Sequence, residues 1–243
     1  MPKNDLKPKV YWSPSRHWLA KQCLRRWAFK YRLGVPYEED ETIFHYGRLV
    51  HKYLETGIKP KEKEMLCGNK PFETMYNFQR HAELAEEYLK RIGTSDEDNA
   101  ECEFALPLKY PSGRKPKYKI KIYGIIDRRL KDWRMIDYKT GAQKWSQTKL
   151  DTHDQFTFYM WASWCETGEM KDFFMLNFIR GNMEAGKEPD IQMRKVERHE
   201  DDFETLMDEV ERLWRQTMVE ESTEKCEGNH CFHCPFKEAC ENF

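Results

Sequence analysis

The spacing of apolar positions along the chain changes near residue 100. Before that point, apolar side chains recur every three or four residues, which predicts helices over residues 13–31, 42–55 and 72–92. Ser13 followed by Pro14 is typical of a helix start, and Gly34 with Pro36 is typical of a stop. The first part of the chain therefore predicts a helical layer.

After residue 100, apolar and polar positions alternate, as in strands that bury one face. The alternation predicts strands over residues 101–108, 118–130 and 133–138, a helix over 152–166, strands over 173–179 and 191–196, and a helix over 201–218. We expect one α/β domain over residues 1–243, with a mixed central sheet flanked by helices. Within it, residues 13–92 would form the helical layer, 93–200 the core, and 201–243 the last helix and a cysteine-rich tail.

Composition is consistent with this interpretation. The 243 residues are 39% hydrophobic and 14% aromatic, which argues against disorder and suffices for one sizeable core. We find no apolar run near the roughly 18 residues that a membrane span needs, so we expect no membrane partner. The polar first residues do not resemble a secretory signal, and we expect a cytoplasmic protein.

The net charge of −1 hides an uneven distribution. Residues 106–150 hold thirteen Lys or Arg and three Asp or Glu, whereas residues 196–243 hold five and fourteen. A locally basic segment suits a polyanion, so Arg114, Lys115 and Lys117 are candidate DNA phosphate contacts. Tyr110 and Tyr118 beside them are candidates to stack on unpaired bases. The alternative is a solvated, charged hairpin.

The most informative residues are Asp127, Asp137 and Lys139. Asp137 and Lys139 are two apart on a predicted strand, so their side chains share a face. If residues 131–133 form a turn, Asp127 falls opposite Asp137, with Cβ atoms about 5 Å apart. Two carboxylates that close repel unless a cation lies between them, and oxygen ligands favour Mg²⁺ or Mn²⁺. A metal-held water with a nearby lysine is what phosphodiester hydrolysis needs.

These residues stand in a longer motif. Gly124-x-x-Asp127 followed by Asp137-Tyr138-Lys139-Thr140-Gly141 resembles the core of the RecB-like PD-(D/E)XK nucleases. Gly47-x-x-x-His51 resembles the helical motif of that family, and Gln155-x-x-x-Tyr159 its next helix. The resemblance implies a restriction-endonuclease-like fold. It assigns metal binding to His51, Asp127, Asp137 and Tyr138, and catalysis to Asp127, Asp137, Lys139, Gln155 and Tyr159. Glu103 is a weaker candidate for a further acidic group.

Four of the eight cysteines lie in the last 18 residues, which indicates a metal or cluster site. Cys231, Cys234 and Cys240 form a C-x2-C-x5-C pattern that resembles the tail of cluster-bearing RecB-like nucleases, including the AddB and CRISPR-adaptation nucleases. The resemblance assigns the fourth ligand of a [4Fe–4S] cluster to Cys23. The alternative is zinc held by Cys226, Cys231, Cys234 and Cys240, or with His230 or His233 substituting. We expect Cys67, Cys102 and Cys165 to be small buried hydrophobes.

The resemblance implies a metal-dependent deoxyribonuclease, an exonuclease that prefers single strands. We find no G-x-x-x-x-G-K-[ST] motif, so no motor is expected, and the nuclease would act alone or beside a helicase, a recombinase or a CRISPR-adaptation protein. Recombination, repair, phage DNA processing and CRISPR adaptation are all compatible settings. Two alternatives are a non-catalytic DNA-binding scaffold that keeps a structural cluster, and a zinc-ribbon interaction protein.

Overall fold

The first stretch of helical periodicity folds as two helices. The structure, a computed structural model, describes residues 10–37, 41–66, 71–95 and 97–243. α1 (Pro14–Gln22) begins where the Ser13 hydroxyl accepts a hydrogen bond from the Arg16 amide, and α2 (Leu24–Tyr31) follows one residue after α1 ends. The residue between them is Cys23, whose backbone is extended, with φ −165° and ψ 116°. The single helix expected over residues 13–31 is thus broken at Cys23.

The other predicted helices form close to their expected bounds. The helices after α2 are α3 (Glu41–Thr56), α4 (Glu62–Met65), α5 (Pro71–Ile92), α6 (Gln147–Asp151), α7 (Asp154–Thr167), α8 (Glu200–Trp214), η1 (Arg215–Val219), η2 (Asn229–Cys231) and α9 (Lys237–Glu241). The sequence pattern did not predict α4, α6, η2 or α9. The helix expected over residues 201–218 forms as α8 and continues as the π-helical turn η1.

The predicted strands form one mixed sheet, with neighbours in the order β1-β2-β3-β4-β5. Only β3 and β4 run parallel; the other neighbouring pairs are antiparallel. The connection between the two parallel strands carries α6 and α7 across one face of the sheet. The strands are β1 (Asn99–Pro107), β2 (Lys121–Arg129), β3 (Met135–Gly141), β4 (Phe173–Ile179) and β5 (Asp190–Val196). The expected α/β architecture is confirmed.

β2 and β3 pair over a short stretch and then separate. The turn between them is residues 131–133, as expected, and Trp133 closes it with a left-handed φ of 69°. Pairing extends only to Arg128 opposite Ile136, one step before the two aspartates. The opened edge of β2 pairs instead with the segment before α1, because the Trp12 amide donates to the Lys121 carbonyl and the Tyr123 amide to the Trp12 carbonyl, both at 2.8 Å.

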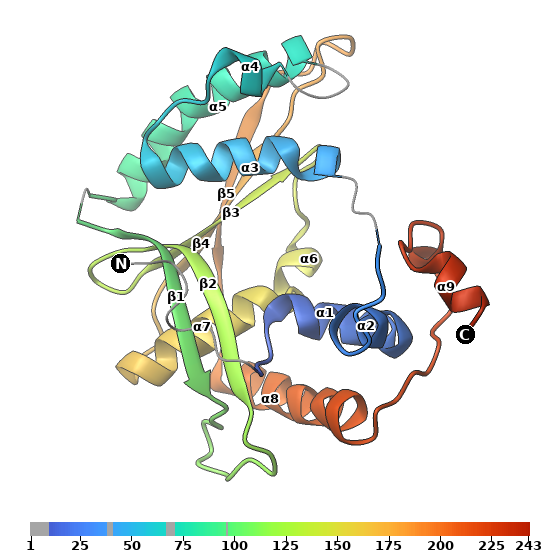
Figure 1. Cartoon of the computed structure of the whole chain (residues 1–243). Helices are drawn as coiled ribbons and strands as arrows, with labels where there is room; N and C mark the ends of the chain where they lie inside the picture. Colours follow the sequence, from blue (N-terminus) through green and yellow to red (C-terminus); the bar gives the residue numbers. More distant parts are fainter. Residues whose placement is uncertain (1–9, 38–40, 67–70, 96) are drawn as a thin grey trace.

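Helices cover both faces of the sheet and enclose two apolar cores (Figure 1). α3 and α5 lie over one face, where Ile136, Tyr138 and Phe178 are buried. α1, α7 and α8 lie over the other, where Phe156 and Met175 are buried. The alternation of β3 therefore sends Tyr138 towards α3 and its neighbours Asp137 and Lys139 towards α7. The separation of β2 from β3 lies between the two layers.

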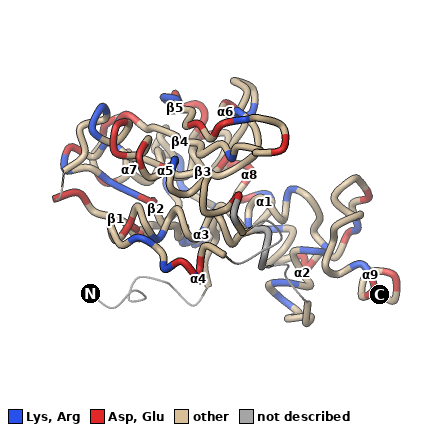
Figure 2. Tube along the Cα trace, turned by 90° about the horizontal axis from the view of Figure 1, so that it is seen from above, with Lys and Arg blue, Asp and Glu red and all other residues tan. Residues whose placement is uncertain are grey.

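The C-terminal tail lies beside α2 in both views of the backbone (Figures 1 and 2). The Arg25 amide donates to the Glu224 carbonyl at 3.1 Å, and Phe29 packs on Phe236 and Phe243 with ring centroids 5.8 and 5.3 Å apart. Both signs of charge occur over the whole trace (Figure 2). None of the described helices is long and apolar enough to cross a membrane.

Candidate active site at the separation of β2 and β3

The Asp127 carboxylate occupies the gap that opens between the two strands. Its Oδ2 accepts a hydrogen bond from the Tyr138 amide at 2.7 Å, which replaces the backbone pairing that ends one residue earlier. Continuing the antiparallel register places Asp127 opposite Asp137, as the sequence predicted. The strands thus separate where the two carboxylates would otherwise be forced into the tightest contact.

Asp137 is fully buried beneath Lys139. The Lys139 ammonium lies 2.8 Å from Asp137 Oδ2 and 3.2 Å from Oδ1. The contact to Oδ1 has hydrogen-bond geometry, but the shorter one to Oδ2 does not, so Oδ2 is buried without a hydrogen-bond donor. Burial, together with the charge of Asp127, raises the Asp137 pKa to about 6 even though Lys139 opposes the shift. A second positive charge near Oδ2, in addition to Lys139, would favour the ionised carboxylate further.

Gln155 and Tyr159 hold Lys139 from α7. Gln155 Oε1 accepts a hydrogen bond from Lys139 Nζ at 2.8 Å, and Gln155 Nε2 donates to the Tyr159 hydroxyl at 2.6 Å. The two α7 residues are four apart and share a helix face. Tyr159 is 4% exposed, and burial raises its pKa well above the usual value, so it stays a neutral phenol. The chain Tyr159–Gln155–Lys139–Asp137 therefore fixes the ammonium over the carboxylate.

His51 reaches the same place from α3, on the other face of the sheet. Its Nε2 donates to the Tyr138 carbonyl at 2.9 Å, and its Nδ1 lies 3.5 Å from Asp127 Oδ1. Burial lowers the His51 pKa, but the hydrogen bond and negative charge of Asp127 outweigh burial, and the pKa is raised. Side chains from both helical layers therefore converge on the two aspartates. Of the residues expected to bind metal, His51 and Asp127 contact the Tyr138 backbone directly and Asp137 precedes it on β3, but among the described residues the ligand atoms of His51, Asp127 and Asp137 do not all lie within 4.8 Å of one another.

Two glycines of the motifs permit these approaches. A Cβ at Gly47 would lie 3.0 Å from Thr140 Oγ1, so the glycine lets α3 lie close against β3, one turn before His51. A Cβ at Gly124 would overlap the Phe104 ring at 2.5 Å. That ring packs edge-on against Tyr159, with centroids 6.1 Å apart. The glycines thus set the distances of the helices that carry His51 and Tyr159.

Asn177 is a site neighbour that the sequence did not identify. It pairs with Lys139 in the parallel register of β3 and β4 and is completely buried. Its amide nitrogen donates to the Gln143 carbonyl at 2.9 Å, while its oxygen is buried without a hydrogen-bond partner among the described atoms. A polar residue within the apolar strand Phe173–Ile179 was the available signal. Glu103, which the sequence suggested as a candidate for a further acidic group, lies on β1 opposite Ile125 of β2.

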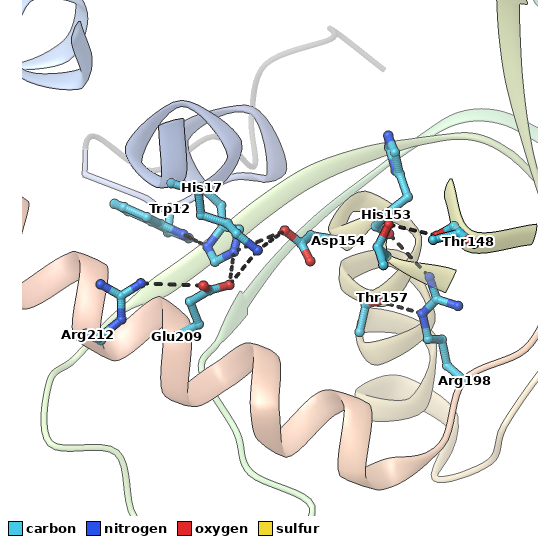
Figure 3. A network of polar contacts seen from close by, with 11 residues as sticks. Trp12, His17, Thr148, His153, Asp154, Thr157, Arg198, Glu209 and Arg212 are labelled. Carbon is cyan, nitrogen blue, oxygen red and sulfur yellow. Dashed lines mark hydrogen bonds and ion pairs between the residues drawn. The ribbon is translucent and has the colours of Figure 1, made fainter. Parts of the chain in front are cut away.

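A second group of potential ligands, His17, Asp154 and Glu209, lies near α7 (Figure 3). His17 Nδ1 accepts from Trp12 Nε1 at 3.2 Å, so its Nε2 carries the proton and donates to Glu209 at 3.0 Å. The Lys21 ammonium lies 2.9 Å from Asp154 and 3.0 Å from Glu209. Lys21 thus supplies the positive charge that a metal would otherwise supply. This network joins α1, α7 and α8.

The cysteines of the tail face Cys23. Cys23, Cys231, Cys234 and Cys240 line one cavity together with Cys226 and His230. Cys23 is buried and Cys226 is exposed. Cys102 and Cys165 are half-buried against the core, less buried than expected, and burial raises the Cys165 pKa to about 12. Cys67 lies outside the described residues.

The basic loop between β1 and β2 lies at the end of β2 away from Asp127 (Figure 1). Arg114 forms ion pairs with Asp208 and Glu204 of α8 and covers the Tyr110 ring at 3.8 Å. Tyr110 is 1% exposed, so the idea that it stacks on bases is wrong. The side chains of Arg114, Lys115 and Lys117 are exposed, and their contact with DNA stays a prediction.

Comparison with known proteins identifies the family. A profile described as the PD-(D/E)XK nuclease superfamily matches residues 11–241. No curated protein matches significantly. Among solved structures, a protein from Eubacterium rectale, named as a candidate exonuclease, is similar in fold, with TM-score 0.65 and 17% identity over 92% of this chain and 87% of that one.

Two further structures are more distant. The crystal structure of SSO0001 has TM-score 0.45 and 12% identity, covering 97% of this chain and 88% of that one. LHK-Exo in complex with dAMP has TM-score 0.36 and 11% identity, covering 96% and 95%. The mixed sheet with helices on both faces is the expected restriction-endonuclease-like fold. The chain belongs to the PD-(D/E)XK nuclease superfamily.

Proposed function

We propose that the chain is a metal-dependent deoxyribonuclease that degrades single-stranded DNA from an end. The observation that carries the proposal is the convergence of two aspartates, a lysine and a histidine where β2 and β3 separate. A structural salt bridge would need only Asp137 and Lys139. The further polar groups from α3 and α7, aimed at the same point, support a reaction centre.

The donor set suits Mg²⁺ or Mn²⁺. Asp127, Asp137, the Tyr138 carbonyl and His51 would hold the ion, since hard divalent cations prefer oxygen ligands and Mn²⁺ accepts an imidazole. The buried Asp137 Oδ2 accepts no hydrogen bond and has only the Lys139 ammonium beside it, so it has a lone pair that a bound ion could use. A bound ion would lower the pKa of a water and neutralise charge on the phosphate.

Lys139 would act on the reacting phosphate. Its ammonium is held by Asp137 and Gln155, which leaves one of its three protons to donate to a phosphate oxygen or to orient a water. Gln155 and Tyr159 are positioning residues in this account, because they reach the phosphate only through Lys139. They reduce the motion of the lysine and so the cost of ordering it in the transition state.

The finer assignment is to the RecB-like nucleases, and it rests on the sequence motifs. The similarity in fold to a candidate exonuclease from Eubacterium rectale is compatible with end-dependent cleavage. The same motifs are compatible with a role in recombination, repair, phage DNA processing or CRISPR adaptation. A non-catalytic scaffold would not need the half-buried Lys139 paired with Asp137, and a zinc-ribbon protein would not need this sheet.

We also propose a [4Fe–4S] cluster held by Cys23, Cys231, Cys234 and Cys240. The cavity they share supports it, as does the burial of Cys23 at the break between α1 and α2. Arg25 ties the two segments, with its side chain 3.0 Å from the Thr223 carbonyl and 3.8 Å from Cys240 Sγ. The alternative, a zinc ion held by Cys226, Cys231, Cys234 and Cys240, would use ligands that line the same cavity.

Two experiments test these proposals. Linear and circular single-stranded DNA, incubated with protein and Mn²⁺, separate end-dependent from internal cleavage: loss of the linear form only is expected, and equal loss of both contradicts the exonuclease assignment. Iron and zinc analysis after oxygen-free purification tests the cluster. Cys23→Ala should lose iron, whereas Cys226→Ala should keep it; stoichiometric zinc without iron would exclude the cluster.

A further inference from the structure

A cavity of about 400 Å³ opens beside Gln155. One wall is the first turn of α1, with Pro14, Ser15 and Trp18, and the other is the junction of α6 and α7, with Lys149, Thr152, His153 and Asp154. Its volume lies within the range of about 300–1,000 Å³ that is typical of small-molecule sites. Because Gln155 lines the cavity and also accepts from Lys139 at 2.8 Å, the cavity borders the candidate active site.

Trp18 leaves an aromatic surface uncovered in this cavity. Its side chain is 53% exposed, although α1 buries its neighbours His17 and Leu19. Burial of a tryptophan side chain contributes a large hydrophobic free energy, which the exposed part of Trp18 does not contribute to folding. By contrast, Tyr110 is buried, and Tyr118 is packed against the core. The exposed indole next to the site therefore offers an aromatic surface that the buried Tyr110 does not.

The charges around the cavity favour an anion. Asp154 shares the Lys21 ammonium with Glu209, at 2.9 and 3.0 Å, whereas the exposed Lys149 packs its ammonium on the Trp145 ring at 3.8 Å and has no carboxylate partner among the described ion pairs. Burial, and after it the nearby charge of Lys139, lowers the pKa of Lys149. Burial and then the charge of Lys139 likewise lower the His153 pKa, to about 4. Lys139, which is paired with Asp137, and Lys149 therefore both lie close enough to act on the lining of the cavity.

We propose that this cavity is a subsite for one unpaired nucleotide adjoining the scissile phosphate, with its base stacked on Trp18 and its phosphate contacted by Lys149. The inference rests on the proposed function and identifies where single-strand preference would arise. A base in a duplex is stacked on its neighbours and paired, so it cannot turn into a cavity of this kind without losing both interactions. An unpaired base is free to do so.

Equilibrium binding tests the subsite independently of cleavage. The Asp137→Asn background prevents hydrolysis, and the dissociation constant of a labelled single-stranded oligonucleotide is measured with Trp18→Ala, Trp18→Phe and Lys149→Ala added in turn. Stacking of one base predicts that Trp18→Ala weakens binding at least about fivefold, and that Trp18→Phe restores most of it. The matched control is Met183→Ala, which removes an apolar side chain of similar exposure, 57%, on the β4–β5 turn and should change nothing.

Abasic substitution along the oligonucleotide gives the specific readout. Removal of one particular base should weaken binding to the Trp18 protein as much as Trp18→Ala does, and should add nothing in the Trp18→Ala variant. A Trp18→Ala effect below twofold, or an equal effect at every abasic position, would overturn the subsite. If the wild-type protein never cleaves DNA but the base-specific effect is found, the catalytic proposal fails and the subsite stands.

Discussion

Lys139 Nζ lies 2.8 Å from Gln155 Oε1, so the ammonium on β3 is held by the first turn of α7. The contact joins β3 of the sheet to α7, and α6 lies between these two elements in the sequence. It means that the position of the lysine depends on how α7 docks. Because the network of His17, Lys21 and Asp154 joins α1 to α7 next to Gln155, the docking of α1 also bears on the lysine.

We predict that Gln155→Ala lowers kcat by about 10- to 100-fold, the usual effect of removing a group that orients a reactive side chain. Lys139 would keep its charge but gain freedom to move. Metal binding, measured by calorimetry with Mn²⁺, should stay within about threefold of wild type, because Gln155 touches none of the proposed ligands. Tyr159→Phe should give a smaller loss in the same direction. Loss of metal binding in Gln155→Ala would show that the residue is a ligand and not a positioning group.

Asp137 and Lys139 should separate metal binding from rate. Asp137→Asn is expected to lose Mn²⁺ binding, whereas Lys139→Met should retain or strengthen it, since a competing positive charge is gone. Cleavage should fall about 100- to 1,000-fold in Lys139→Met, as expected when a transition-state donor is removed. A Lys139→Met protein that binds no metal would contradict these roles, provided that its circular dichroism matches wild type.

Gly47 is predicted to control how closely α3 approaches β3. Gly47→Ala places a methyl group 3.0 Å from Thr140 Oγ1, so either the Thr140 side chain gives by a few tenths of an ångström or α3 shifts and carries His51 with it. We expect a loss of about 1–3 kcal/mol in the free energy of unfolding and weaker Mn²⁺ binding. Thr140→Ala in the same protein removes the opposing oxygen and should recover much of both. Equal effects of Gly47→Ala with and without Thr140→Ala would show that the contact is not the cause.

Acid should weaken the attachment of α1. Burial raises the Asp154 pKa, but hydrogen bonds from His17 and Lys21 outweigh burial and lower this pKa to about 2. For Glu209, the hydrogen bond from His17 has the largest effect; it outweighs burial, which acts in the opposite direction, and the pKa is lowered to about 2. Carboxyl groups with lowered pKa values stabilise the fold above their unfolded pKa values, near 4, and lose this contribution as the pH falls towards 2. Asp154→Asn should therefore flatten the fall in unfolding free energy between about pH 5 and pH 2. Identical pH profiles for the two proteins would contradict the role of the network.

Much of the site could be predicted because its residues lie in local motifs. The turn at residues 131–133 and the spacing of two between Asp137 and Lys139 suffice to set register and face. The separation of β2 from β3 could not be predicted, because alternation marks strands but not where backbone pairing ends. The separation depends on Trp12, which is over 100 residues away in sequence and takes over the open edge of β2.

Other features escaped prediction because they need long-range contacts. The helical period runs on through Cys23, so nothing local indicates the extended residue between α1 and α2. Asn177 reaches Lys139 only through the parallel register of β3 and β4. The charge pattern suggested a free basic loop, but Arg114 is paired with α8, whose acidic face lies about 90 residues further along the chain. Composition counts charges and cannot show which are already paired.

The most direct test of the central claim is cleavage of end-labelled single-stranded DNA by wild-type protein and by Asp137→Asn, each with Mg²⁺, Mn²⁺ or EDTA. Two aspartates that hold an ion where β2 and β3 separate predict cleavage by wild type with either metal, none with EDTA, and none by Asp137→Asn with any addition. Iron content and circular dichroism should be the same in both proteins, which excludes unfolding as the reason. Cleavage by Asp137→Asn at the wild-type rate, or by wild type in EDTA, would contradict the account.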